Sequence, residues 1–143
     1  MGADDVRHML ESNTLSAFTL IRAVRAQLRL DRGAYVFFGA AGVEGLRARG
    51  DAAAYFMAKT ALLSLVRSVA KEEASFGVRV NMLSPGLVPH EHASDDTKAL
   101  AGSIPAGRPG RGTDLAHAAA WLLSAEAEYV TGQNMDVAGG WML

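Results

Sequence analysis

The stretch AYVFFGAAG, residues 34–42, decides the fold of this chain. Its first five residues, Ala34–Phe38, form a short continuous apolar run, which predicts a β-strand buried on both faces. The glycine-rich residues 39–45 and the polar stretch to Asp51 predict a loop. We therefore expect a buried strand that ends in a loop.

A helix is predicted on the amino-terminal side of that strand. The segment Asp4–Arg29 carries apolar residues at helical spacing, and Asp4 and Asp5 suit the positive end of a helix dipole. Asn13 falls inside the apolar stripe, where a buried amide must find partners. Two alternatives stay open for Asn13: a structural hydrogen bond or local kink, or a polar group held at the floor of a site.

After the loop, the sequence alternates between predicted helices and strands. The helix Ala52–Ser75 is apolar nearly all round, so it needs cover on more than one side, for which a second subunit is a candidate. The other predicted elements are a strand Val78–Leu83, a weak helix Asp95–Leu100, a helix capped by Thr113 or Asp114, and a strand Asn134–Val137. This alternation is typical of an α/β fold with a parallel sheet and right-handed crossovers.

Tyr55 and Lys59 are the candidate reactive pair. They lie four residues apart at the start of the second predicted helix, so their side chains share one face. A free phenol has a pKa of about 10, and a nearby cation favours the phenolate. We expect Lys59 to lower the pKa of Tyr55, which could then exchange a proton with a carbonyl or alcohol oxygen. The same spacing also arises by chance in many helices.

Composition excludes several classes of function. The chain has 143 residues, which predicts one domain spanning residues 1–143. A net charge of -1 without a basic cluster argues against a nucleic-acid partner. The absence of cysteine excludes disulfides and a thiol nucleophile. Neither a signal peptide nor an apolar run of membrane-spanning length is present, so we expect a cytoplasmic protein without a membrane partner.

Several ordered motifs resemble the C-terminal, catalytic half of the short-chain dehydrogenases/reductases, from about Val6 to Leu143. The motifs are ESN around Asn13, Tyr-x-x-x-Lys at Tyr55 and Lys59, NMLSPG at 81–86, IPAGR at 104–108, and YVTGQ with DV and GG at 129–140. The resemblance implies a Rossmann-like fold limited to that half, with about three parallel strands and flanking helices. It also implies hydride transfer between NAD or NADP and a small carbonyl or alcohol substrate.

The resemblance also implies roles for individual residues. Tyr55 would be the general acid/base, and Lys59 would lower its pKa and hold the nicotinamide ribose. Asn13 would anchor a water in the proton relay. Pro85, Gly86 and the backbone of Val88 would contact the nicotinamide, so the cofactor-binding set comprises Tyr55, Lys59, Pro85, Gly86 and Val88. In the family the two long helices form a four-helix dimer interface, so we expect a homo-oligomer, or completion of the domain by another subunit.

Three departures from the family pattern affect these expectations. No Ser lies between Ser16 and Ser64, and Ala40 or Gly42 takes the place of the serine that holds the substrate oxygen. Losing one such donor typically costs about 10²–10³ in rate. The sequence also lacks the Gly-x-x-x-Gly-x-Gly turn that seats the pyrophosphate, and His90 stands where the family usually has a Thr.

Two functions are therefore compared below. The chain is part of an NAD(P)-dependent carbonyl reductase or alcohol dehydrogenase, or it is a catalytically silent subunit with a binding or scaffold role. In both cases we expect the isolated chain to be inactive. His90-Glu91-His92 is interpreted as part of a polar lid, and no metal site is expected.

Overall fold

The computed structural model describes the chain except for residues 46, 90–99, 101 and 143. The predicted first helix is a continuous helical rod in three parts, α1 (Ala3–Leu10), the π-helical segment η1 (Glu11–Leu15) and α2 (Ser16–Asp31). The remaining longer elements are β1 (Ala34–Phe38), α3 (Ala53–Glu73), β2 (Arg79–Pro85), α5 (Gly112–Leu123) and β3 (Asn134–Val137). The weak helix predicted at Asp95–Leu100 falls almost wholly outside the described residues.

The three strands form one parallel sheet in the order β1-β2-β3, as the alternation of elements predicts. Ala34 of β1 pairs with Arg79 of β2, and Met82 of β2 pairs with Asn134 of β3. The predicted bounds of β1 and β3 agree with the structure. Within the described part of the chain, β1 is an edge strand with one row of backbone groups outside this sheet.

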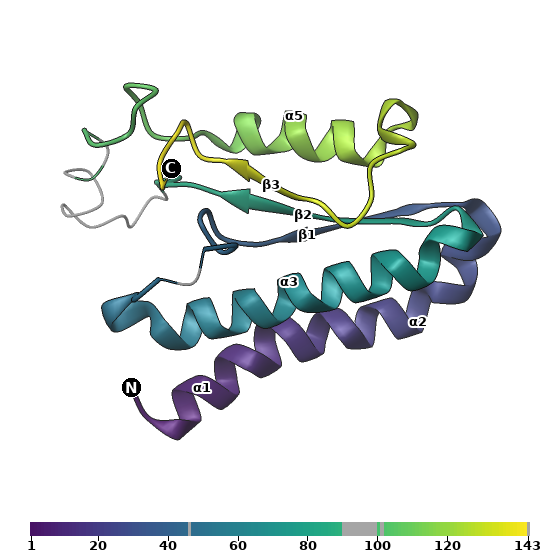
Figure 1. The fold of residues 1–143 in the computed structure, drawn as a ribbon, viewed down its shortest axis with the longest axis horizontal. Coiled ribbons are helices and arrows are strands. Elements are labelled where there is room, and N and C mark those ends of the chain that lie inside the picture. The colour runs from purple at the N-terminus through teal and green to yellow at the C-terminus, as the bar shows by residue number, and fades with distance from the viewer. Residues whose placement is uncertain (46, 90–99, 101, 143) are drawn as a thin grey trace.

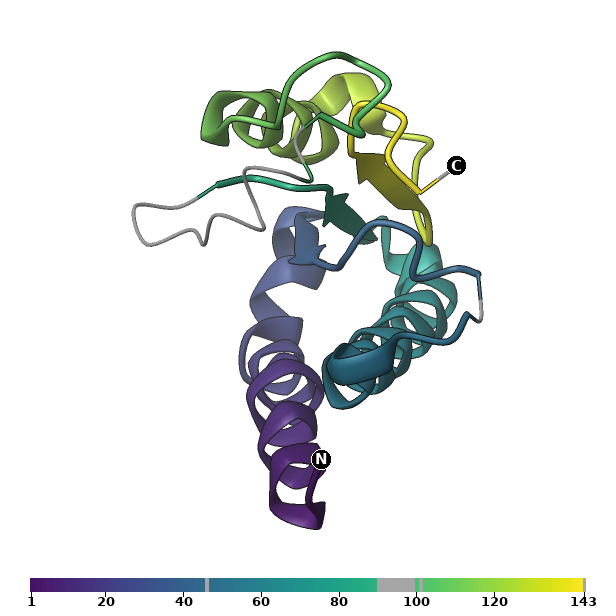
Figure 2. The same cartoon turned by 90° about the vertical axis from the view of Figure 1, so that its left-hand side faces the viewer.

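Helices cover both faces of the sheet. Figure 1 shows α2 and α3 side by side on one face and α5 on the opposite face. Figure 2, turned by 90°, shows the α1–α2 rod and α3 lying next to each other beneath the strands. No described helix is both long enough and apolar enough to cross a bilayer.

β1 alternates in burial, which corrects the prediction that both of its faces are buried. Tyr35 and Phe37 lie in the core with α2 and α3, whereas Phe38 is 50% exposed. The two buried rings stack with their centroids 5.7 Å apart. A continuous apolar sequence hides this alternation, because the outward face of the strand carries an aromatic side chain too.

The ends of two helices differ in detail from the sequence expectation. The break after α2 is where Asp31-Arg32-Gly33 predicts it, with Arg32 in the left-handed conformation at φ 52°. At α5 the N-cap is Arg111, not Thr113 or Asp114. Asp114 lies in the first turn, where its carboxylate accepts hydrogen bonds from the Arg111 backbone at 2.8 Å and from the Arg108 guanidinium.

A buried charge joins α2 to α3. Glu73 is 1% exposed and accepts two hydrogen bonds from Arg29, at 2.7 and 2.9 Å, and it also pairs with Arg25. The Arg29 hydrogen bond holds the pKa of the Glu73 carboxyl below its ordinary value. Arg29 lies flat on the Phe76 ring, 3.6 Å from its centroid. This cluster fixes how the two long helices pack at the end remote from Tyr55.

Candidate active site

Tyr55 and Lys59 share one face of α3, as their spacing predicts. The Lys59 Nζ lies 5.4 Å from the centroid of the Tyr55 ring, within the range of a cation–π contact. Lys59 is buried, and its ammonium donates a 2.8 Å hydrogen bond to the Phe38 carbonyl oxygen at the end of β1. The phenol is 36% exposed and so remains accessible to a ligand.

The expected lowering of the Tyr55 pKa is wrong. Burial raises the pKa of the Tyr55 phenol, and burial likewise lowers the pKa of the Lys59 ammonium. The physical reason is that the surroundings of α3 disfavour either charged form, while the lysine hydrogen bond goes to Phe38. Tyr55 is therefore a neutral phenol at physiological pH, a group that can donate a proton.

Asn13 lies in the π-helical segment η1, where the Ser16 N–H bonds to the Glu11 carbonyl five residues earlier. Its side-chain Nδ2 donates to the Met9 carbonyl at 3.0 Å and to Ser12 Oγ at 3.1 Å, so these bonds stay within its own helix. Both alternatives for Asn13 keep some support. The contacts are structural, and π-helical turns are frequent at functional sites.

Thr14 links this π-helical turn to the candidate reactive pair. Its hydroxyl donates a 3.0 Å hydrogen bond to the carbonyl of Ala58, the residue before Lys59. No sequence motif singles out Thr14, because the long-range partner of a threonine within a helix is defined only once the helices are packed. Through this bond η1 holds the backbone from which Lys59 projects.

A cavity of about 360 Å³ opens beside Tyr55. Its lining combines residues after β1, at the start of α3, after β2 and near the carboxyl terminus: Ala40, Ala41, Ala52, Tyr55, Phe56, Pro85, Gly86, Leu87, Val88, Pro89 and Trp141. Of the predicted site residues, Tyr55, Pro85, Gly86 and Val88 therefore meet in one cavity. Lys59 and Asn13 do not line it.

The loop after β1 supplies no hydroxyl group to the cavity. Ala40 and Ala41 are both buried and line it, whereas Gly42 turns away at φ 72° with its N–H bonded to Asp136. Of the loop residues after β1, Ala40 and Ala41 are therefore the ones that line the cavity. Among the described lining residues, Tyr55 carries the one side-chain hydroxyl.

Arg49 joins this loop to α3 through its side chain, a contact that no sequence motif predicts. Its Nη2 donates a 2.8 Å hydrogen bond to the Gly42 carbonyl, and its guanidinium lies 4.1 Å from the centroid of the Phe56 ring. Phe56 in turn meets the Tyr55 ring edge-on, with centroids 5.4 Å apart. The position of Tyr55 therefore depends on a chain of contacts that begins in the loop after β1.

At the end of β2 the backbone packs closely against neighbouring segments of the chain. The Gly86 N–H bonds to the Val137 carbonyl at 3.0 Å, and a Cβ atom on Gly86 would come within 2.6 Å of the Ala138 Cα. The Pro85 carbonyl accepts a bond from Ala41 at 2.9 Å. These bonds bring the segment after β2 against both neighbouring segments, at the carboxyl edge of the sheet where open α/β folds bind ligands.

The residues present fit one end of a dinucleotide. The flat apolar walls at Pro85, Gly86 and Val88 suit a nicotinamide ring, and Lys59 supplies a cation nearby. No described helix begins with the glycine-rich turn that would hold the pyrophosphate. The predicted polar lid at His90-Glu91-His92 lies outside the described residues.

The fold and this cavity define a Rossmann-like α/β protein, and comparison with known proteins gives the family. Residues 1–142 match the family model described as enoyl-(acyl carrier protein) reductase. The chain is 36% identical over 145 residues to the 3-oxoacyl-(acyl-carrier-protein) reductase FabG of Escherichia coli, covering 98% of this chain and 59% of that protein. The chain belongs to the short-chain dehydrogenase/reductase family.

Solved structures agree with this assignment. A variant of a Serratia marcescens short-chain dehydrogenase/reductase superposes with a TM-score of 0.89 at 28% identity, covering 100% of this chain and 59% of that one. A 3-oxoacyl-(acyl-carrier protein) reductase of Brucella melitensis, solved with bound NAD, gives 0.87 at 27% identity, covering 100% and 54%. The chain thus spans a little over half the length of these relatives.

Proposed function

We propose that this chain carries the proton-transfer half of an NAD(P)-dependent carbonyl reductase or alcohol dehydrogenase. The observation that carries the proposal is the cavity in which Tyr55 meets Pro85, Gly86 and Val88 at the carboxyl edge of the sheet. In this proposal Tyr55 is the general acid/base, Lys59 and Asn13 support it, and residues 1–143 form one truncated domain. The family assignment and the NAD-bound relative support this function.

The residues of this chain act on the oxygen of the substrate. The chemistry that a bound NAD or NADP supplies is hydride transfer to or from carbon. Tyr55 donates its phenolic proton to the carbonyl oxygen as charge develops there, and its raised pKa keeps that proton in place beforehand. Lys59 holds a positive charge 5.4 Å from the ring and stabilises the phenolate that results.

The second candidate function is a catalytically silent subunit. It is favoured by one observation, namely that Ala40 and Ala41 stand where a second hydroxyl donor would be needed. Such a subunit would keep the cavity for binding and would support a partner chain. The two functions differ in one measurable property, proton transfer by Tyr55.

The decisive experiment measures NADH and NADPH oxidation with a panel of small ketones and compares three proteins. Under the first function Tyr55→Phe abolishes whatever turnover the chain shows, because the ring still packs but has no exchangeable proton. Tyr129→Phe is the matched control, since Tyr129 is fully exposed and remote from the cavity. Measurable turnover that is equal in Tyr55→Phe and the unmodified chain would remove Tyr55 from its role.

Cofactor binding is tested separately by titration with NADH and NADPH, followed by cofactor fluorescence. We expect weak binding by the isolated chain, because contacts to the nicotinamide end alone remain. Saturation-transfer NMR should then show stronger contact at the nicotinamide protons than at the adenine protons. Micromolar affinity, or equal saturation of both rings, would contradict this expectation.

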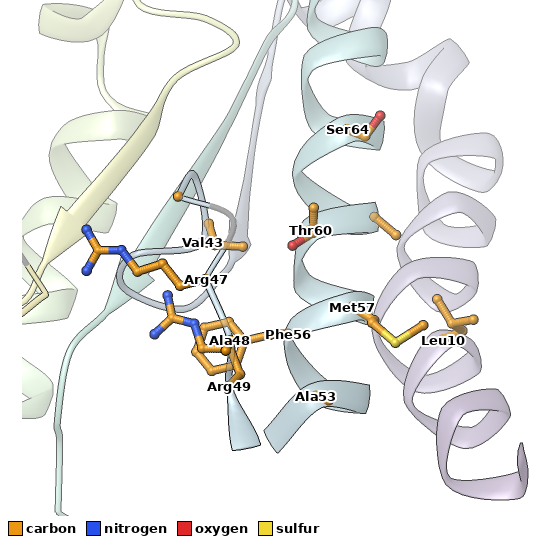
Figure 3. A pocket seen from close by; sticks show the side chains of 12 residues that line it. Leu10, Val43, Arg47, Ala48, Arg49, Ala53, Phe56, Met57, Thr60 and Ser64 are labelled. Carbon is orange, nitrogen blue, oxygen red and sulfur yellow. The ribbon is translucent and has the colours of Figure 1, made fainter. Parts of the chain in front are cut away.

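We also propose a cytoplasmic location and assembly into a homo-oligomer or with a completing subunit. A groove of about 660 Å³ runs between the loop after β1 and α3, and Figure 3 shows Leu10, Met57 and Phe56 on its walls. Met57 is 50% exposed although it is apolar. A second copy of the chain would cover this face.

A further inference from the structure

Trp141 reaches the cavity from the carboxyl-terminal turn, a segment that the sequence motifs do not connect with substrate. It follows two glycines in the left-handed region, Gly139 at φ 63° and Gly140 at φ 84°. Its backbone N–H closes the turn by bonding to the Ala138 carbonyl at 3.1 Å. The indole lies among the lining residues together with Tyr55.

Contacts on two sides hold this turn in place. The Gly139 carbonyl accepts a hydrogen bond from Ala106 at 2.9 Å, and a Cβ atom on Gly139 would come within 2.9 Å of the Ala106 Cβ. On the other side, Arg49 donates to the Met142 sulfur at 3.6 Å. These contacts hold the backbone from which Trp141 faces the cavity.

The rest of the described lining is hydrocarbon or aromatic apart from the Tyr55 hydroxyl and backbone groups. It contains no charged side chain. The nearby Lys59 ammonium does not line the cavity and donates to the Phe38 carbonyl. The Arg49 guanidinium is engaged by Gly42 and Phe56. A charged group placed in such a cavity loses its hydration without gaining a partner, which is costly. An aromatic ring instead gains contact area and ring-on-ring packing against an indole.

We propose that Trp141 determines the specificity of this site, and that the site takes neutral, ring-bearing carbonyl compounds whose ring lies against the indole while the carbonyl oxygen faces Tyr55. This inference rests on the proposed function for its carbonyl group, but the preference for a neutral ring follows from the cavity walls. It makes Trp141 a binding residue, with no part in proton transfer.

The test is an NMR titration of the ¹⁵N-labelled chain with acetophenone and with its matched anion, 4-acetylbenzoate. The chain has two tryptophans, so its indole N–H signals are assigned with Trp121→Phe and Trp141→Phe; Trp121 lies on α5 and serves as the internal control. Acetophenone should shift the Trp141 signal saturably and leave Trp121 unmoved. 4-Acetylbenzoate should bind at least tenfold more weakly.

Variants at residue 141 separate specificity from folding. Trp141→Phe keeps an aromatic wall and should hold the affinity for acetophenone within about threefold, followed through the amide signals of Ala40 and Ala41. Trp141→Ala should lose at least tenfold while amide signals in β2 and α5 stay in place. Equal binding of both ketones, or equal affinity of the Ala and Phe variants, would overturn the proposal.

Three further outcomes separate the two proposals. A Trp141 signal that responds to nicotinamide mononucleotide but not to acetophenone would assign the indole to the cofactor and refute the proposal. Saturable acetophenone binding at Trp141, together with turnover that survives Tyr55→Phe, would refute the proposed function alone. Turnover of 4-acetylbenzoate as fast as acetophenone would refute the specificity proposal and leave the proposed function standing.

Discussion

The Lys59 ammonium donates a 2.8 Å hydrogen bond to the Phe38 carbonyl oxygen and so ties α3 to the carboxyl end of β1. This bond fixes a buried cation below the loop that carries Ala40 and Ala41. Burial also costs the charged form, as the lowered pKa of Lys59 shows. The same lysine therefore joins two elements through its hydrogen bond, while its burial disfavours its charge.

Lys59→Met should consequently separate function from stability. Methionine fills a similar volume and removes a buried charge, so the free energy of unfolding should change by less than about 1 kcal/mol. Turnover, or nicotinamide binding where no turnover is found, should be lost. The readouts are urea unfolding and the NAD(P)H assay, and Lys71→Met, at an exposed position of α3, is the control. Full activity of the Lys59 variant would contradict its role.

Ala40→Ser should restore a hydroxyl donor to the cavity. Because removing one donor to a developing oxyanion costs about 10²–10³ in rate, restoring it should raise NAD(P)H oxidation at least about tenfold. Ala41→Ser is the matched control, since both alanines are buried and line the same cavity. A gain at position 41 alone would show that residue 41, and not residue 40, is the position where a donor is needed. No gain at either position would contradict this prediction.

The sequence predicts most of the fold because its strands are short and are bounded by glycine, although β1 alone is a continuous apolar run. The bounds of β1 and β3 and the break at Arg32 follow directly from this punctuation. The π-helical turn at Glu11–Leu15 was missed, because its altered hydrogen bonds leave the apolar spacing nearly unchanged. The exposed side of Phe38 was missed because an outward aromatic residue looks like core in the sequence.

The candidate site was predictable only where its residues lie on a motif. Tyr55, Pro85, Gly86 and Val88 meet in the cavity as expected, although their roles stay predictions. Thr14, Arg49 and Trp141 were not foreseen. Each acts through a partner distant in sequence, so its role depends on packing that no local pattern encodes.

Thr14→Val tests the bond between η1 and α3. It removes the hydroxyl that donates to Ala58 at 3.0 Å while keeping the shape of the side chain, and should lower the free energy of unfolding by about 1 kcal/mol. Thr19→Val is the control, because Thr19 bonds within its own helix at an exposed position, to Leu15. If both variants lose the same free energy of unfolding in urea, the bond between η1 and α3 contributes no more to stability than a bond within one helix.

Glu73→Gln should destabilise the packing of α2 on α3. It removes the charge that Arg29 and Arg25 share, and hydrogen bonds to charged groups contribute about 1.5–3 kcal/mol, so a loss of about 2 kcal/mol is expected. Water reaches both arginines, which limits the loss. Glu72→Gln, at an exposed carboxylate that also contacts Arg25, should cost much less.

The Glu73 effect should also depend on pH with a definite sign. Its pKa in the folded chain is lowered, so the carboxylate contributes its full stability above the ordinary value of 4.5. That contribution is lost as the pH falls from 4.5 through the lowered value. The stability difference between the unmodified chain and Glu73→Gln should therefore be constant near neutrality and shrink in acid. A difference that grows on acidification would be the wrong sign.

The last prediction concerns assembly through α3. On this helix Val66 is fully buried in the core and Leu65 packs against it, so charges at these positions would damage the fold itself. Met57 is the better probe. It lines the groove between α3 and the loop after β1 and is 50% exposed.

Met57→Lys should convert an oligomer into a monomer, because a lysine in the covered groove would lose its hydration without a partner. Leu123→Lys is the matched control, since Leu123 is 52% exposed but lies on α5, across the sheet from α3. Light scattering at tens of micromolar should show a lower mass for the Met57 variant alone, with unchanged circular dichroism. A monomeric unmodified chain, or equal effects of the two substitutions, would rule out this face as the interface.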